Sequence, residues 1–157
     1  MAVKKTRAIL LIAFLCIVFI AFLSLAAAGR SRRMTAQQRV TAQQGEVARG
    51  KYLVENVAMC TECHTPRDER GNLEPEALLQ GAAIWITPTK PIPNWADYAP
   101  VLAGLPSYTD AQMENVLEKG IGPNGEVIRP PMHIYHMDPV DAKAIIAYLK
   151  SLPMKKS

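Results

Sequence analysis

Two cysteines and a histidine near the middle of the chain are close enough in sequence to act on one ligand. Cys60, Cys63 and His64 form the pattern C-x-x-C-H. Two thiols three positions apart on one helical turn can bond to both vinyl groups of a single porphyrin, and the imidazole that follows can bind its iron. The pattern therefore predicts one covalently attached haem c, with Cys60 and Cys63 as attachment residues and His64 as an iron ligand.

Two other kinds of site use similar residues. A thioredoxin-like C-x-x-C pair needs a βαβ context, and the chain has no run of residues typical of buried strands. The sharper alternative is a Cys₂His₂ zinc interaction domain that uses Cys60, Cys63, His133 and His136. Only two residues separate those histidines, fewer than zinc sites usually have, and zinc leaves His64 without a role.

Candidates for a second iron ligand lie in residues 129–137. Methionine raises the reduction potential relative to a second histidine, and a stable electron carrier usually has ligands on both faces of the iron. Met132 follows two prolines that fix the backbone. Met137 precedes a predicted helix cap, where an apolar residue commonly packs as a hydrophobic staple. We expect Met132 to be the ligand, with Met137 as the fallback and His133 or His136 as further alternatives.

The first 28 residues read as a membrane anchor or a signal peptide. Residues 8–28 form an uncharged, almost wholly apolar stretch of 21 residues after Lys4, Lys5 and Arg7. This length crosses the hydrocarbon core of a bilayer and exceeds that of a usual signal-peptide core. Three alanines at the end of the stretch would suit a signal peptidase. We favour an uncleaved transmembrane helix and keep cleavage as the alternative.

Charge does not decide the orientation, because Arg30, Arg32 and Arg33 make the second flank basic too. In bacteria, haem is attached outside the cytoplasmic membrane. We therefore expect a single-pass protein of that membrane with its globular part in the periplasm, or a soluble periplasmic protein if the signal is cleaved. Three cysteines, two of them in the motif, do not make a disulfide scaffold.

The net charge of +4 over 157 residues comes from the N-terminal part. From residue 45 onward, 11 Lys and Arg stand against 14 Asp and Glu, a net charge of −3. A nucleic-acid partner is therefore not expected. Residues 29–44 are polar, repeat Thr-Ala-Gln-Gln, and read as a linker whose helicity the sequence leaves open. Residues 45–157 form the predicted globular domain.

Three helices and long loops are expected in that domain. The helix before Cys60 has an apolar face formed by Val47, Leu53, Val54, Val57 and Ala58. The proline-rich residues 65–107 leave little room for regular structure. Thr109 and Gln112 form a capping box for a helix that Gly120 ends. Asp138 caps the last helix, whose apolar stripe is Val140, Ala144, Tyr148 and Leu152, widened by Ile145 and Leu149.

The attachment motif, the Pro-Pro-Met132 loop and the last helix together resemble class I cytochrome c over residues 45–153. The segments RGKYLVENVAMCTECHTPRDERG and DAKAIIAYLKSLP are similar to bacterial monohaem cytochromes, including haem subunits of membrane-bound alcohol and sugar dehydrogenases. Those subunits commonly carry three such domains, whereas this chain carries one.

The resemblance implies an all-α cytochrome c fold in which the N- and C-terminal helices cross near perpendicular and long loops surround one haem. Gly50 would allow their close approach, and Tyr148 would pack at the crossing. A backbone carbonyl should accept a hydrogen bond from the second nitrogen of His64, with Pro75 as the candidate. Donors to a haem propionate could come from Trp85, Asn94, Trp95 and Tyr98.

The expected function is electron transfer by a membrane-tethered monohaem cytochrome c in a periplasmic respiratory chain. No acid, base or nucleophile constellation stands out, so the chain is not expected to be an enzyme by itself. It would accept electrons as a subunit of a dehydrogenase or donate them to a terminal oxidase. The alternative is a haem sensor or catalytic haem protein with a labile sixth ligand.

Overall fold

The structure, a computed structural model, describes residues 35–155. The predicted anchor of residues 1–28 lies outside these residues. The chain divides into two compact units, Met1–Gln43 and Gln44–Ser157. In the first unit, the described residues 35–43 of the predicted linker are helical. Among the described residues, no helix combines the length and apolar character needed to cross a membrane.

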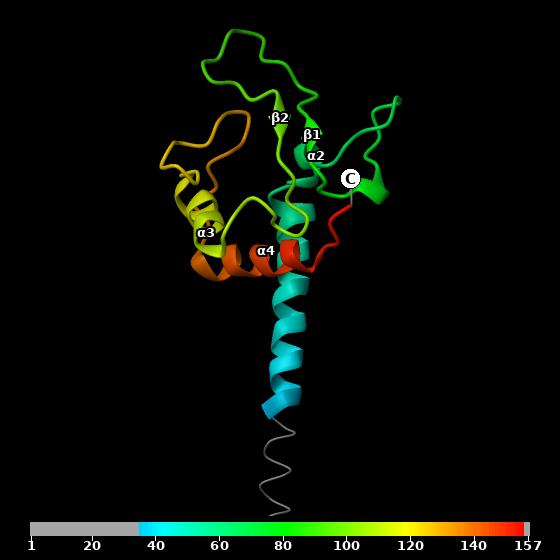
Figure 1. The fold of residues 1–157 in the computed structure, drawn as a ribbon, viewed down its shortest axis with the longest axis vertical. Helices are drawn as coiled ribbons and strands as arrows, with labels where there is room; N and C mark the ends of the chain where they lie inside the picture. Colours follow the sequence, from blue (N-terminus) through cyan, green and yellow to red (C-terminus); the bar gives the residue numbers. More distant parts are fainter. Residues whose placement is uncertain (1–34, 156–157) are drawn as a thin grey trace, which may run out of the picture. The chain divides into compact units, whose positions relative to one another are not determined.

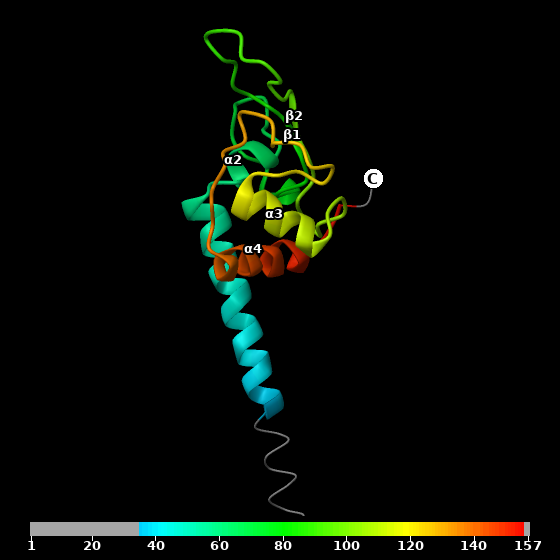
Figure 2. The same cartoon turned by 90° about the vertical axis from the view of Figure 1, so that its left-hand side faces the viewer.

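The second unit is mainly helical, as expected, with one short two-stranded sheet (Figures 1 and 2). Its elements are a helix over residues 44–52, a π-helical turn at Leu53–Val57, α2 (Thr61–His64), a 3₁₀ turn at Pro75–Ala77, β1 (Ala82–Ala83), β2 (Tyr98–Ala99), α3 (Asp110–Lys119) and α4 (Pro139–Ser151). The strands are antiparallel, with Ala82 opposite Ala99. Strands of two residues are too short to show an alternating pattern in the sequence. The loop between the two strands extends away from the helices in both views.

The predicted ends of α3 and α4 are confirmed. The Thr109 hydroxyl accepts a hydrogen bond from the Gln112 amide at 3.3 Å, and the Gln112 side chain accepts one from the Thr109 amide at 2.9 Å. Gly120 ends α3 in the left-handed conformation with φ 69°. Asp138 caps α4 by accepting from the Val140 amide at 2.8 Å. These caps satisfy backbone groups that have no partner within a helix.

The buried face of α4 differs from the predicted stripe at its start. Ala144, Tyr148 and their neighbours are buried as expected, but Val140 is 73% exposed. Ala142, two positions later and therefore on roughly the opposite side of the helix, is buried instead. The predicted four-residue repeat was therefore wrong for Val140 in the first turn, because the buried face of α4 begins only at Ala142.

A π-helical turn changes which residues face the core before the attachment motif. The Ala58 amide donates to the Leu53 carbonyl at 2.8 Å, and the Cys60 amide donates to the Val54 carbonyl at 2.9 Å. Each wider turn holds more residues than an α-helical turn, so the apolar face is rotated. Leu53 and Val54 are therefore buried, whereas the expected core residue Val57 is 54% exposed.

The helix over residues 44–52 crosses α4 at Gly50 (Figure 1), which confirms the expected close approach. A Cβ atom at Gly50 would overlap the Ala144 carbonyl group and lie 2.8 Å from the Tyr148 Cβ. The Tyr148 hydroxyl donates to a Glu55 carboxylate oxygen at 2.5 Å. Arg49 and Asp141 form a bidentate ion pair at the surface of the crossing, with both N–O distances 3.0 Å. The crossing is thus set by backbone contact and bordered by polar contacts.

Candidate haem site

A largely apolar cavity of about 450 Å³ lies beside the attachment motif. Its walls come from α2, β2, α3, α4 and residues 122–135. The two predicted attachment residues, Cys60 and Cys63, and the two preferred iron ligands, His64 and Met132, all line it. The attachment motif and Met132, about 70 positions apart in sequence, thus line the same cavity.

Both motif cysteines are free thiols at the edge of one helical turn. Cys60 is buried at the N-cap of α2, and Cys63 is half-buried within that helix. Burial raises the pKa of the Cys60 thiol to about 11 and also raises the pKa of Cys63. Both thiols therefore keep their protons at neutral pH.

One ring nitrogen of His64 forms a hydrogen bond, and the other is available to bind a metal. Its side chain is buried, and Nδ1 lies 2.8 Å from the Pro100 carbonyl oxygen. Because a carbonyl only accepts, Nδ1 carries the hydrogen and Nε2 keeps its lone pair for a metal. Burial lowers the pKa of His64, which favours the neutral imidazole that metals require.

The carbonyl that fixes this tautomer belongs to Pro100, so the prediction of Pro75 was wrong. Pro75 starts a 3₁₀ turn, whereas Pro100 directly follows β2. The Gly81 amide, just before β1, donates to the His64 carbonyl at 2.8 Å. Pairing of β1 with β2 therefore sets Pro100 against the histidine, and the sequence carried no signal for so short a pair.

The candidates for the second ligand differ in position. The half-buried Met132 lines the cavity. Met137 is not among the lining residues; it packs against the hydrophobic core, and its amide donates to the Leu117 carbonyl at 3.1 Å. His133 lines the cavity but is exposed, and His136 is exposed outside the lining. Both methionines pack against the hydrophobic core, but only Met132 also lines the cavity.

The zinc alternative needs four side chains at one point. Over residues 35–155, no three His, Cys, Asp or Glu side chains gather closely enough to hold a metal ion. Cys60, Cys63, His133 and His136 therefore do not form a tetrahedral site.

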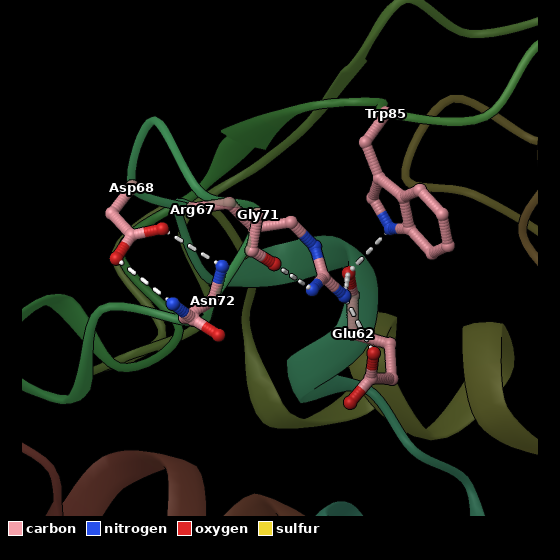
Figure 3. Close-up of polar contacts among 6 residues, drawn as sticks. All are labelled: Glu62, Arg67, Asp68, Gly71, Asn72 and Trp85. Carbon is pink, nitrogen blue, oxygen red and sulfur yellow. Dashed lines mark hydrogen bonds and ion pairs between the residues drawn. The ribbon is translucent and has the colours of Figure 1, made fainter.

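A polar cluster covers the outer side of α2 (Figure 3). The Arg67 guanidinium donates to a Glu62 carboxylate oxygen at 2.5 Å and to the Gly71 carbonyl at 2.7 Å. It lies 4.6 Å from the centroid of the Trp85 ring, within cation–π range. The Trp85 indole N–H donates to the Glu62 carbonyl of the attachment helix at 3.0 Å. Neither Arg67 nor Glu62 is marked in the sequence by a motif that predicts this cluster.

The donor set fits haem c. One cavity presents two thiols three positions apart, an imidazole with its tautomer fixed, and a thioether. The remaining walls are mostly apolar and include Leu102, Met113, Val116, Leu117, Ile145 and Leu149. Apolar walls around an iron exclude water and limit exchange of its ligands.

A family model described as Cytochrome c matches residues 47–153. The chain belongs to the cytochrome c family. That membership implies haem c as the cofactor, in agreement with the C-x-x-C-H motif.

Several curated relatives of this cytochrome are subunits of larger assemblies. It is 35% identical over 116 residues to the fructose dehydrogenase cytochrome subunit of Gluconobacter japonicus, covering 68% of this chain and 22% of that protein. It is 33% identical over 121 residues to the alcohol dehydrogenase (quinone) cytochrome c subunit of Komagataeibacter europaeus, covering 69% and 25%. A diheme cytochrome c-type from Cereibacter sphaeroides is 32% identical over 118 residues, covering 69% and 36%. The chain thus spans about a quarter to a third of the length of these relatives.

Proposed function

We propose that this chain is a membrane-tethered monohaem cytochrome c that carries single electrons in a periplasmic respiratory chain. The observation that carries the proposal is the buried His64, whose Nδ1 is fixed by the Pro100 carbonyl in a cavity that Cys60, Cys63 and Met132 also line. This arrangement supplies two covalent attachment points and two iron ligands. The single C-x-x-C-H motif supports one haem.

Bound haem c supplies an iron that gains or loses one electron. Cys60 and Cys63 would hold the cofactor through thioether bonds, which would prevent its dissociation. His64 would bind the iron as a neutral imidazole and Met132 as a neutral thioether, and a thioether ligand favours the reduced state. The apolar walls exclude water, which further favours the form with less net charge.

The proposed partners are redox proteins. The chain would accept electrons from a dehydrogenase, either as its subunit or as a separate carrier, or donate them to a terminal oxidase. The dehydrogenase cytochrome subunits among its relatives support the first role. Residues 8–28 would tether the domain to the outer side of the cytoplasmic membrane.

Absorption spectra of the protein matured with haem test this function. We expect a covalent c-type spectrum and, in the oxidised state, the far-red band of a sulfur–iron bond. Met132→Ala should abolish that band, whereas the control Met137→Ala should keep it. Carbon monoxide binding to the reduced wild-type protein at neutral pH would favour the sensor or catalytic class, and the absence of covalent haem would overturn the proposal.

The tether is tested by intact mass and membrane fractionation. A mass that includes residues 1–28, with the protein in the membrane fraction, is the expected result. A mature chain that begins after residue 28 and is released with the periplasm would overturn the tether and leave the electron-carrier role standing.

A further inference from the structure

Met132 lies in the segment of residues 129–135. Arg129 hydrogen-bonds the start of this segment to the loop between β1 and β2. Its Nε donates to the Asn94 carbonyl at 3.0 Å, and its Nη2 donates to the Trp95 carbonyl at 2.6 Å. Alongside, the Ala96 amide donates to the Pro130 carbonyl at 2.7 Å. The planar guanidinium thus holds two successive carbonyls at once, which a lysine ammonium does not match in geometry.

Tyr135 ties the other end of the segment to the residues that lead into the attachment motif. Its hydroxyl donates to the Ala58 carbonyl at 2.8 Å, two positions before Cys60. The ring packs against the hydrophobic core and meets the His133 ring edge-on at 5.2 Å. Burial raises the pKa of Tyr135 to about 12, so the phenol keeps its proton at neutral pH.

Met132 lies midway between Arg129 and Tyr135, three residues from each. Its amide donates to the Arg129 carbonyl at 3.1 Å, so the backbone of Met132 is hydrogen-bonded to that of Arg129. The side chain is half-buried and lines the cavity. Movement of residues 129–135 away from the cavity would stretch the hydrogen bonds of Arg129, of Tyr135, or of both.

We propose that Arg129 and Tyr135 are positioning residues that keep the Met132 thioether on the iron by holding both ends of its segment. The inference rests on the proposed function, because it takes Met132 as the second iron ligand. Neither residue need touch the iron. Each favours the closed segment over the open one, and the sixth position is available to an outside ligand only in the open state.

Imidazole binding to the oxidised holoprotein measures how often the methionine is released. Apparent affinity rises in proportion to the fraction of protein that is open. Loss of one hydrogen bond worth about 1 kcal/mol should raise that affinity about fivefold. We expect this increase for Tyr135→Phe and for Arg129→Lys, with the far-red band weakened in both. Tyr52→Phe, which removes an exposed hydroxyl away from the cavity, should leave affinity and band unchanged.

A Met132→Ala background separates methionine positioning from a general loosening of the site. With no methionine to release, Tyr135→Phe should no longer change imidazole affinity, so the two substitutions are coupled. Arg129→Gln distinguishes geometry from charge, because lysine keeps the cation and glutamine does not. We expect both Arg129 variants to raise the affinity.

Three results would overturn the inference. They are wild-type affinity in both Tyr135→Phe and Arg129→Lys, the same increase for Tyr135→Phe with and without Met132, and an increase for Arg129→Gln alone. A wild-type holoprotein without the far-red band would instead overturn the His64 and Met132 ligation of the proposed function. The two failures are therefore distinguishable.

Discussion

At the helix crossing, backbone lies against backbone, with no space for a side chain between Gly50 and Ala144. Around the cavity, the loops are held by side chains that reach across to carbonyl groups, as Arg129, Tyr135 and Trp85 do. The crossing is close-packed and tolerates little change in volume. The loop contacts are separate hydrogen bonds, each worth about 1 kcal/mol.

These two kinds of contact should respond differently to substitution. Substitutions at the crossing should change the free energy of unfolding of the whole domain. Substitutions at the loop contacts should change local opening and iron ligation more than global stability, because each contact holds one segment. Four predictions test this difference beyond the experiments on Met132, Arg129 and Tyr135.

The largest effect is expected for Gly50→Ala. The new methyl group would overlap the Ala144 carbonyl, so the two helices must separate, and we expect a loss of about 3 kcal/mol in unfolding free energy. Gly45→Ala in the same helix is the matched control, because nothing lies within 4 Å of its added Cβ. It should stabilise the domain by about 0.5–1 kcal/mol through helix propensity. Denaturant unfolding of the holoproteins measures both, and equal effects would contradict the proposed role of the crossing.

A smaller loss is expected for Tyr148→Phe, which removes the hydrogen bond to Glu55 but keeps the ring. We expect about 1 kcal/mol in unfolding free energy at pH 7 and unchanged imidazole affinity, the opposite of Tyr135→Phe. A changed imidazole affinity in Tyr148→Phe would contradict the expectation that contacts at the crossing do not affect iron ligation.

The same tyrosine should give a pH dependence. Burial, followed by the hydrogen bond to Glu55, raises the pKa of Tyr148 above its usual 10.0. The folded protein therefore keeps a proton that the unfolded chain releases above pH 10, and this contribution to stability is lost as pH rises toward the folded pKa. The stability difference between wild type and Tyr148→Phe should shrink from pH 7 to pH 10.5. A constant difference would mean that the raised pKa does not contribute.

The smallest change in the unfolding free energy of the whole domain is expected at Trp85, in the cluster of Figure 3. Trp85→Leu removes both the hydrogen bond to the Glu62 carbonyl and the cation–π contact with Arg67. The local opening free energy of the loop should fall by about 1 kcal/mol, read as roughly fivefold faster hydrogen exchange of the Ile84 amide, which donates to the Asp97 carbonyl. Trp85→Phe keeps an aromatic face and should show a smaller change. Equal exchange in all three proteins would show that the cluster does not hold the loop.

Local sequence signals were sufficient where neighbouring residues decide the structure. Thr109 and Gln112 cap α3 through each other, and Asp138 caps α4 through the amide two residues later. Gly50 was also predicted correctly, because a glycine within an apolar helix indicates close approach. The stripe failed at Val140 and Val57 because the start of the buried face and the π-helical turn depend on what packs against the helix.

The sequence alone predicted the attachment chemistry, because spacing within one helical turn brings together the two thiols and the imidazole of Cys60, Cys63 and His64. It also limited the candidates for a second iron ligand to residues 129–137. Only the tertiary structure decided that Pro100 accepts from His64, that Met132 lines the cavity while Met137 packs elsewhere, and that Arg129 and Tyr135 hold the segment between them. These contacts join residues 34 to 77 positions apart. Every residue carries a carbonyl group, so the sequence does not show which carbonyl will accept the hydrogen bond.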